Sequence, residues 1–396
     1  MWHEATKELQ AEGKVKMVGI IPEQHPDRTR LFMQWKQMDW PILLDSANLM
    51  AVTRVPITLL IDEFGVIRSV RPQVEELDDF LSHRYEETAP PPQAVLPDLE
   101  ELKKVSQQDT VGSWCAYAHA VSLWGQPAEI TEAIKTYLKV LEKEPEHGPT
   151  HFHLGVAYRK RYDSDHRQPE DFQKAVEYWG KALDIDPNQY IWRRRIQQYG
   201  PRLDKPYSFY DWVEEARREI MARGERPAQL LVEPGGAELA YPSESFETAE
   251  TVQEEPDPRG RIFRDEKDFI QVETTLVPSA VAAGESARVH LVFRPNPEVK
   301  AHWNNEVDDL ILWVNPVEGW EVDHSYWTVA NPPEVVSQEV RVIEFELRSP
   351  EKPVGSMTLP AYALYYVCED IDGTCLYRRQ DISLQVQVSS RQLADP

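Results

Sequence analysis

The sequence predicts three kinds of structure in succession: an α/β segment, an α-helical segment and an antiparallel β-sandwich. In the first segment, short apolar runs of strand length alternate with stretches of helical periodicity. Between residues 112 and 223, aromatic, leucine and alanine residues recur at helical spacing. Beyond residue 265 the apolar pattern has a period of two, with turn residues between the runs. Together these patterns predict a multidomain chain.

Composition supports several domains and excludes some partners. The 396 residues include 31 prolines, which cluster in two stretches that are typical of linkers. The formal net charge of −24 should repel phosphate backbones, so we expect no binding to nucleic acid. No apolar stretch is long enough for a membrane span. The predicted domains and linkers are 1–84 (α/β), 85–111 (proline-rich linker and lead-in helix), 112–224 (helical), 225–264 (acidic, proline-rich linker) and 265–390 (sandwich).

The first domain is expected to run helix, strand, helix, strand, helical turn, strand, strand. These elements are predicted at 2–12, 15–21, 27–38, 42–44, 48–53, 57–61 and 66–70. The segment Val55-Pro56-Ile57-Thr58, followed by an apolar strand and Asp62-x-x-Gly65, resembles the redoxin and thioredoxin-like family. The resemblance implies that Pro56 is cis and that Val55, Pro56, Ile57 and Thr58 face a protein partner. The family's redox cysteine is missing, because no cysteine occurs before Cys115.

The helical domain contains two related stretches. Leu154-Gly155-x-Ala-Tyr158, with Ala133 and Ala175 each followed by a proline twelve positions later, resembles the tetratricopeptide repeat. The resemblance implies a layer of paired helices that docks protein partners. Further helices over 190–198 and 208–223 are expected to cap this stack.

In the last domain, two strands rich in aromatic and β-branched residues flank a six-residue loop that contains Asp372-Gly373. Cys368 and Cys375 lie at the two ends of this loop and can face each other within disulfide reach. The arrangement resembles the amino-terminal domain of the thiol:disulfide interchange protein DsbD, an immunoglobulin-like sandwich. The resemblance implies that Cys368 and Cys375 form a candidate redox pair.

The residues around this pair leave three interpretations open. Arg378 and Arg379 would lower thiol pKa values, whereas Glu369, Asp370 and Asp372 would keep the thiols protonated. The pair is therefore a redox-active dithiol, a structural staple of the hairpin, or two idle thiols in a reducing compartment.

Other candidate sites favour structural roles. Cys115 is expected to be a small buried hydrophobe, and His151 and His153 are too closely spaced to bind a metal from one helix face. His302, beside Asn304 and Asn305, is expected in a polar loop at one end of the sandwich. The sequence contains no phosphate-binding loop and no metal motif, so we expect no cofactor and no metal.

We therefore expect a thiol–disulfide redox-related protein that acts on or through protein partners. One alternative is a non-catalytic interaction scaffold built from degenerate redox folds. Another is a fragment of a redoxin or peroxiredoxin whose nucleophile lies upstream. Oxidoreductase activity requires either an active Cys368–Cys375 pair or a truncated N-terminus. The compartment is cytoplasmic if Met1 is the true start, and periplasmic or otherwise extracytoplasmic if a signal peptide has been lost. The sequence does not predict the oligomeric state.

Overall fold

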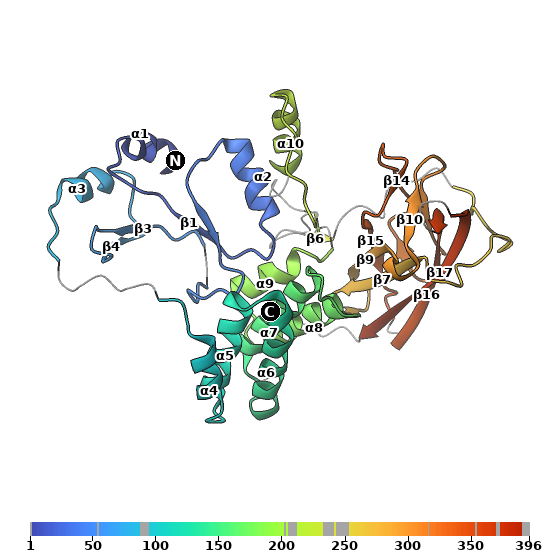
Figure 1. Cartoon of the computed structure of the whole chain (residues 1–396), viewed down its shortest axis with the longest axis horizontal. Coiled ribbons are helices and arrows are strands. Elements are labelled where there is room, and N and C mark those ends of the chain that lie inside the picture. The colour runs from blue at the N-terminus through green and yellow to red at the C-terminus, as the bar shows by residue number, and fades with distance from the viewer. Residues whose placement is uncertain are drawn as a thin grey trace. The chain divides into compact units, whose positions relative to one another are not determined.

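The chain combines helices with mostly antiparallel β-sheets (Figure 1). The computed structural model describes residues 2–53, 55–87, 95–201, 203–204, 212–232, 241–242, 253–315, 317–352, 355–369 and 373–389. Residues 88–94 of the first predicted linker, and residues 233–240 and 243–252 of the second, lie outside these residues. The chain divides into two compact units. Unit 1 comprises 1–166, 181–195 and 208–233, and unit 2 comprises 167–180, 196–207 and 234–396.

Unit 1 begins with small helices and two short sheets, as the sequence predicts. Strands β1 and β2 pair in parallel, with Gly19 opposite Ile42. Strands β3 and β4 form a separate antiparallel pair, with Leu59 opposite Val70. The elements are α1 (Trp2–Ala11), β1 (Gly19–Ile21), α2 (Asp27–Lys36), β2 (Ile42–Leu44), β3 (Leu59–Ile61), β4 (Ile67–Val70) and α3 (Glu76–Ser82).

The prediction of a helical turn at 48–53 is wrong, because this segment forms non-helical turns instead. Asn48 has a left-handed backbone with φ of 53°, which a right-handed helix excludes. The Asp45 carboxylate accepts hydrogen bonds from the backbone N–H groups of Leu49 and Met50. Asn48 also exchanges two side-chain hydrogen bonds with the backbone of Val52. These local bonds take the place of helical ones.

Helices follow in the region where helical periodicity predicts them. Asp98 caps the first through the backbone N–H groups of Glu100 and Glu101, and Thr110 caps the second in a reciprocal capping box with Ser113. The helices are α4 (Leu99–Ser106), α5 (Val111–Trp124), the 3-10 turn η1 (Pro127–Glu129), α6 (Ile130–Lys143), α7 (Gly148–Tyr162), α8 (Asp171–Ile185) and α9 (Tyr190–Gln197). Helices α5, α6 and α7 pack consecutively.

Helix α10 (Trp212–Ala222) does not cap this stack, contrary to the expectation for 208–223. It packs on α2 instead, where Leu31 and Trp35 form a buried cluster with Val213, Ala216 and Ile220. The Trp35 indole N–H donates a 2.7 Å hydrogen bond to the Glu219 carboxylate. The apolar face of α10 therefore packs on a helix, α2, that lies about 180 positions earlier in the chain.

Unit 2 contains two sheets that share one core. The first sheet has the order β12-β15-β9-β7, and the second has the order β13-β11-β16-β10-β14, with β17 paired to β16 and to β8. The strands are β7 (Ile270–Val277), β8 (Ala280–Ala282), β9 (Ser286–Pro295), β10 (Ala301–Asn304), β11 (Leu310–Val314), β12 (Glu321–Val322), β13 (Tyr326–Val329), β14 (Val336–Ser337), β15 (Arg341–Arg348), β16 (Gly355–Glu369) and β17 (Cys375–Ser389). The unit also has the 3-10 turn η3 (Pro297–Val299) and a pair formed by β5 (Leu203–Asp204) and β6 (Tyr241–Pro242).

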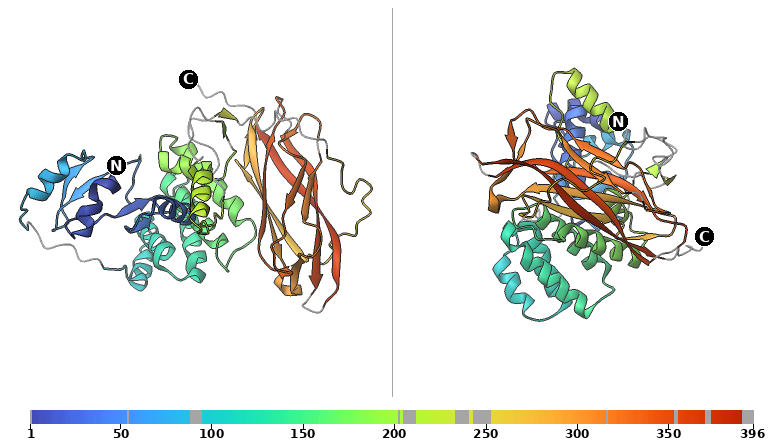
Figure 2. Two further views of the ribbon diagram at one scale, coloured as in Figure 1. Left: turned by 90° about the horizontal axis from the view of Figure 1, so that it is seen from above. Right: turned by 90° about the vertical axis from the view of Figure 1, so that its right-hand side faces the viewer.

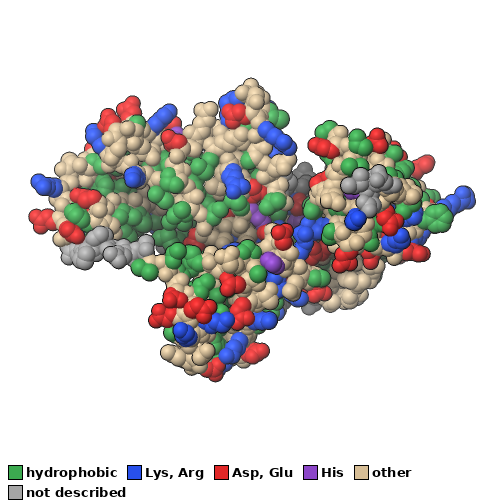
Figure 3. Space-filling view, in the orientation of Figure 1, with side chains coloured by type: hydrophobic (Ala, Val, Ile, Leu, Met, Phe, Trp, Pro, Cys, Tyr) green, Lys and Arg blue, Asp and Glu red, His purple; other side chains and the backbone are tan. Residues whose placement is uncertain are grey.

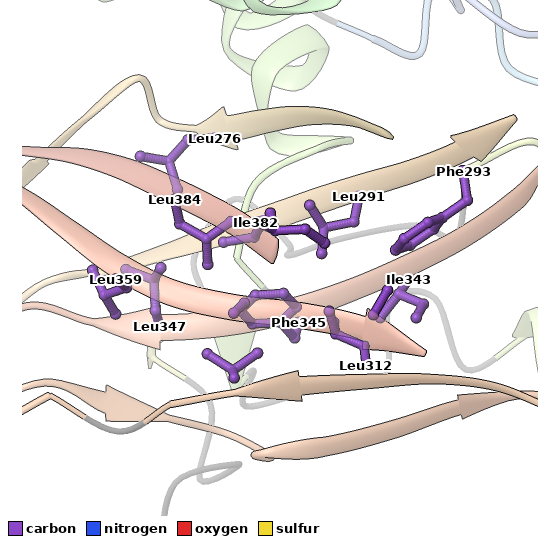
Figure 4. Packing of buried hydrophobic residues seen from close by; sticks show 14 of the residues in the cluster. Leu276, Leu291, Phe293, Leu312, Ile343, Phe345, Leu347, Leu359, Ile382 and Leu384 are labelled. Carbon is purple, nitrogen blue, oxygen red and sulfur yellow. The ribbon is translucent and has the colours of Figure 1, made fainter. Parts of the chain in front are cut away.

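The core lies between the two sheets, where buried side chains from both meet (Figure 4). Phe345 and Leu291 come from one sheet, and Leu312 and Leu384 from the other. The period-two patterning predicts strands at 269–277, 287–293, 310–314, 340–347, 362–368 and 375–388. All six are present as β7, β9, β11, β15, β16 and β17, although their ends differ by up to seven residues. Figure 2 shows the long hairpin of β16 and β17, coloured orange-red to red, along one layer. This hairpin carries the candidate site.

Candidate functional site

The predicted cysteine pair lies at the end of the β16–β17 hairpin. Cys368 and Cys375 are directly opposite each other in the strand register. They form a disulfide with Cα atoms 4.0 Å apart. Cys368 is only 2% exposed, whereas Cys375 is exposed. The expectation that the two cysteines face each other is confirmed, and residues 370–372 of the intervening loop lie outside the described residues.

The disulfide lies on the outer face of its sheet. Alternate residues of β16 from Leu359 to Val367 point into the core, so Cys368 points to the opposite face. On that face Tyr366 stacks on Tyr377, with ring centroids 4.4 Å apart. Burial raises the pKa of Tyr377 to about 12, so this phenol stays neutral at physiological pH. The exposed sulfur therefore borders an uncharged aromatic surface.

His302 is in a strand, and the expectation of a polar loop is wrong for this residue. It belongs to β10, directly opposite Cys368 on β16, and is 7% exposed. Its neighbour Trp303 points into the core and donates its indole N–H to the Glu339 carbonyl at 2.9 Å. The anchored tryptophan explains why a polar-looking run forms a strand. Only Asn305 and the residues after it form the turn.

The two arginines near the dithiol in sequence are engaged elsewhere. Arg379 lies in ion pairs with Asp257 at 2.9 Å and Asp381 at 2.7 Å, and its guanidinium stacks over the Tyr362 ring. Arg378 is opposite the core residue Tyr365, on the other face of the hairpin from Cys375. Neither guanidinium is therefore placed to stabilise a thiolate of the pair.

The second predicted site, the Pro56 loop, lies in unit 1. The Val55–Pro56 peptide bond is cis, as the resemblance implies. Val55 is 47% exposed and Ile57 is 40% exposed, so their apolar side chains reach the surface. Thr58 accepts a 2.7 Å backbone hydrogen bond from Arg71, which fixes the loop where it enters β3. The partner-facing role of Val55, Pro56, Ile57 and Thr58 stays a prediction.

Other apolar side chains near this loop are also exposed. Figure 3 shows hydrophobic side chains gathered on the surface over the N-terminal elements. Each of the short strands β1 to β4 contributes, since neither two-stranded sheet continues into a larger one. The exposed residues of this surface are Val18, Ile20, Leu43, Leu44, Val55, Ile57, Ile61, Ile67 and Val70. We call this set the N-terminal apolar surface.

The sequence analysis missed a buried polar cluster in the helices of unit 1. His119 Nε2 lies 2.6 Å from His153 Nδ1, and His153 Nε2 lies 2.8 Å from the Ala47 carbonyl. Because a carbonyl only accepts, His153 carries its proton on Nε2 and accepts from His119. Lys160 donates to the Ser122 carbonyl in the same region. The two histidines are 34 positions apart, which is the usual tetratricopeptide period and could have revealed the pair.

Burial disfavours the charged forms of His119, His153 and Lys160. It lowers the pKa of His153 to about 3, with a further contribution from His119, and it also lowers the pKa of His119 and of Lys160. His151 lies apart from the pair and bonds to the Pro145 carbonyl at 2.7 Å. Cys115 is half-buried rather than buried, and its thiol contacts Thr150 Oγ1 at 3.6 Å. Burial raises the pKa of the Cys115 thiol, which disfavours the reactive thiolate.

The described part of the chain has neither a membrane-spanning helix nor a metal-binding cluster. None of its helices is long and apolar enough to cross a membrane. Within the same residues, no group of three or more histidine, cysteine, aspartate or glutamate side chains is arranged to hold a metal ion.

Comparisons with known proteins add little. No protein-family model matches the chain, and no curated protein matches it. Solved structures that resemble it in part include the sporulation control protein Spo0M from Bacillus subtilis, with 15% identity and a TM-score of 0.17 over 31% of this chain and 50% of that chain. A PapD-like domain of human CEP192 has 9% identity and a TM-score of 0.17, over 37% of this chain and 99% of that chain. The bacterial hydrophobin BslA has 12% identity and a TM-score of 0.16, over 31% of this chain and 95% of that chain. Likeness this weak supports no inference about this chain.

Proposed function

We propose that the chain is a thiol–disulfide exchange protein that acts on protein partners through Cys368 and Cys375. The observation that carries the proposal is the position of the pair on adjacent strands, with Cys368 buried and Cys375 exposed. An exposed sulfur is open to attack by a thiolate, and access is one of the factors that set exchange rates. The aromatic surface formed by Tyr366 and Tyr377 suits contact with a protein.

The exchange proceeds in two steps. A partner thiolate attacks Cys375 Sγ and forms a mixed disulfide, while the bond to Cys368 breaks and its electron pair leaves with the Cys368 sulfur. The partner's second thiolate then attacks the partner sulfur of the mixed disulfide, and Cys375 leaves as a thiolate. Two electrons pass from the partner dithiol to the hairpin, and two protons from the partner's thiols end on Cys368 and Cys375. The reverse sequence passes the electrons to the next disulfide.

The finer fold assignments belong to the same proposal. We assign residues 265–390 to a DsbD amino-terminal-like, immunoglobulin-like sandwich, because the two sheets share one core and carry cysteines on adjacent strands. Residues 1–84 are assigned as thioredoxin-like on the parallel β1–β2 pair and the antiparallel β3–β4 pair. Residues 112–224 are assigned as tetratricopeptide-type on consecutive packing of α5, α6 and α7.

In this proposal the parts without thiol chemistry bind protein. The N-terminal apolar surface exposes nine large apolar side chains, most of them about half exposed or more. Large exposed apolar side chains are a feature of interaction sites. Helices of the tetratricopeptide type are likewise binding platforms. The proposed partners are therefore proteins.

One observation favours a second candidate function, a non-catalytic scaffold with a structural disulfide. Arg378 and Arg379 are engaged away from the sulfurs, so neither guanidinium is placed to stabilise a thiolate of the pair. Without such a cation, a hairpin disulfide resembles a staple more than a redox centre. Direct electron transfer separates the two functions.

The test mixes the oxidised full chain, carrying Cys115→Ser, with a reduced dithiol protein of the thioredoxin type. Acid quenching, alkylation and mass measurement count the thiols on both proteins. We expect two thiols to appear on the chain for each partner oxidised, and none on a variant with Cys368→Ser and Cys375→Ser. A chain that stays oxidised with the protein partner would overturn the exchange function and favour the scaffold. Transfer that survives the double substitution would place the site elsewhere.

A further inference from the structure

A row of three side chains crosses three neighbouring strands at the dithiol. Strand β16 lies between β10 and β17, with His302 opposite Cys368 on one side and Cys375 opposite Cys368 on the other. Directly opposed residues of antiparallel strands share a face, with Cβ atoms about 4.5–5.5 Å apart. His302 and Cys368 are therefore cross-strand neighbours on the outer face of the sheet. Both side chains are buried, at 7% and 2% exposure.

This geometry matters because the two sulfurs have different roles in exchange. The exposed Cys375 is the sulfur that an incoming thiolate reaches, so Cys368 is the sulfur that leaves. A thiolate released at a buried position is poorly solvated, which slows its departure. A proton donor beside that sulfur removes the charge as it develops. Histidine is the side chain that changes its protonation state near neutral pH.

We propose that His302 is the acid–base residue of the dithiol: it protonates Cys368 as the disulfide opens and removes that proton as it closes. The inference rests on the proposed exchange function. As the partner thiolate bonds to Cys375 Sγ, the bond between the two sulfurs breaks and its electron pair goes to Cys368 Sγ. The imidazolium of His302 gives its proton to that sulfur, which leaves a neutral imidazole and a thiol. In the reverse direction the imidazole takes the proton and the Cys368 thiolate attacks.

Several charged and phenolic groups near His302 are engaged with other partners or point to the other face of the sheet. Glu369, next to Cys368, is held by Lys267 at 3.3 Å, and Arg378 points to the other face. The Tyr366 and Tyr377 phenols stack on each other. On the flanking segments, Glu339 pairs with Arg341, and Lys300 precedes the strand. Among the described residues of the cross-strand row, His302 is thus the side chain whose type serves in acid–base chemistry.

The test uses the full chain with Cys115→Ser and reduced dithiothreitol as the probe. The rate of reduction of the disulfide is measured between about pH 5 and pH 8, where histidine titrates. To correct for the amount of attacking thiolate, this rate is divided by the fraction of dithiothreitol present as thiolate at each pH. We expect this corrected rate to fall by about tenfold or more as the pH rises and the imidazolium is lost, since general acid catalysis contributes at least that much. In His302→Gln the corrected rate should be low and independent of pH.

His324→Gln, a histidine of the same unit that lies outside the cross-strand row, is the matched control and should keep the falling profile. A flat corrected rate in the parent chain would overturn the inference without any variant, even if His302→Gln does not fold. A falling profile that persists in His302→Gln would overturn it as well. Either result leaves transfer from a protein dithiol intact, so the proposed function can stand while this inference fails. A disulfide that dithiothreitol does not reduce would overturn both.

Discussion

Residues of the same type differ in reactivity in this chain because they differ in how deeply they are buried. Cys368 and Cys375 share one disulfide, yet only Cys375 is exposed, which gives the two sulfurs different roles in exchange. Cys115 is half-buried and its thiol pKa is raised by burial, so it should react slowly. His153 shows the same effect most strongly, since burial lowers its pKa to about 3. Burial, rather than residue type, therefore decides which group is chemically available.

His153 should make stability depend on pH. Its pKa is about 3 in the folded chain, whereas histidine in an unfolded chain titrates near about 6.5. The unfolded state therefore binds an extra proton at lower pH. The stabilisation is fully present above about pH 6.5 and is lost as the pH falls toward 3, at up to about 1.4 kcal/mol per pH unit. Urea unfolding of the full chain at several pH values measures this slope.

The comparison variant for this prediction is His153→Gln, which cannot take up the proton. Its free energy of unfolding should depend less steeply on pH than that of the parent chain, by up to one proton. His166→Gln, at an exposed position, should keep the parent slope. Equal slopes for His153→Gln and the parent would show that His153 is not held uncharged by folding.

At the scale of elements, local pattern predicted the type of most helices and strands but not what they pack against. The period-two runs predicted β16 and β17, because alternate residues such as Leu384 and Val386 fill the core. The pattern missed β10, whose strand depends on core packing of Trp303 beside polar neighbours. It also misplaced α10, since an apolar stripe identifies a buried face but not the partner, here α2.

The α2–α10 contact can be tested at Ile220, which is fully buried in it. Ile220→Ala should lower the free energy of unfolding by about 2–5 kcal/mol, because the lost side chain leaves a cavity. Met221→Ala is the matched control, since this next residue is 58% exposed and its loss should change stability by about 0.5 kcal/mol at most. Urea denaturation of both variants measures the difference. Similar losses in the two variants would contradict the packing of α10 on α2.

At the scale of the whole molecule, the chain joins one compact unit with exposed apolar strands to another that carries the dithiol. The sequence sufficed to place Cys368 opposite Cys375, because the hairpin turn and the flanking strands are local features. It did not suffice for His302, because the pairing of His302 with Cys368 joins strands far apart in the chain. The spacing of His119 and His153 was a usable signal, but it reveals the pair only when it is compared with a repeat period. Local patterns carry no direct record of such pairings.

The central claim is that Cys368 and Cys375 exchange electrons with protein thiols, and their reduction potential tests it most directly. The full chain with Cys115→Ser is equilibrated in thiol–disulfide buffers of known potential, quenched with acid and alkylated. Its mass is then measured to give the fraction of the pair that is reduced. We expect a midpoint above about −300 mV, within the range of exchanging protein disulfides. A midpoint well below about −300 mV would identify a structural staple and contradict the proposed function.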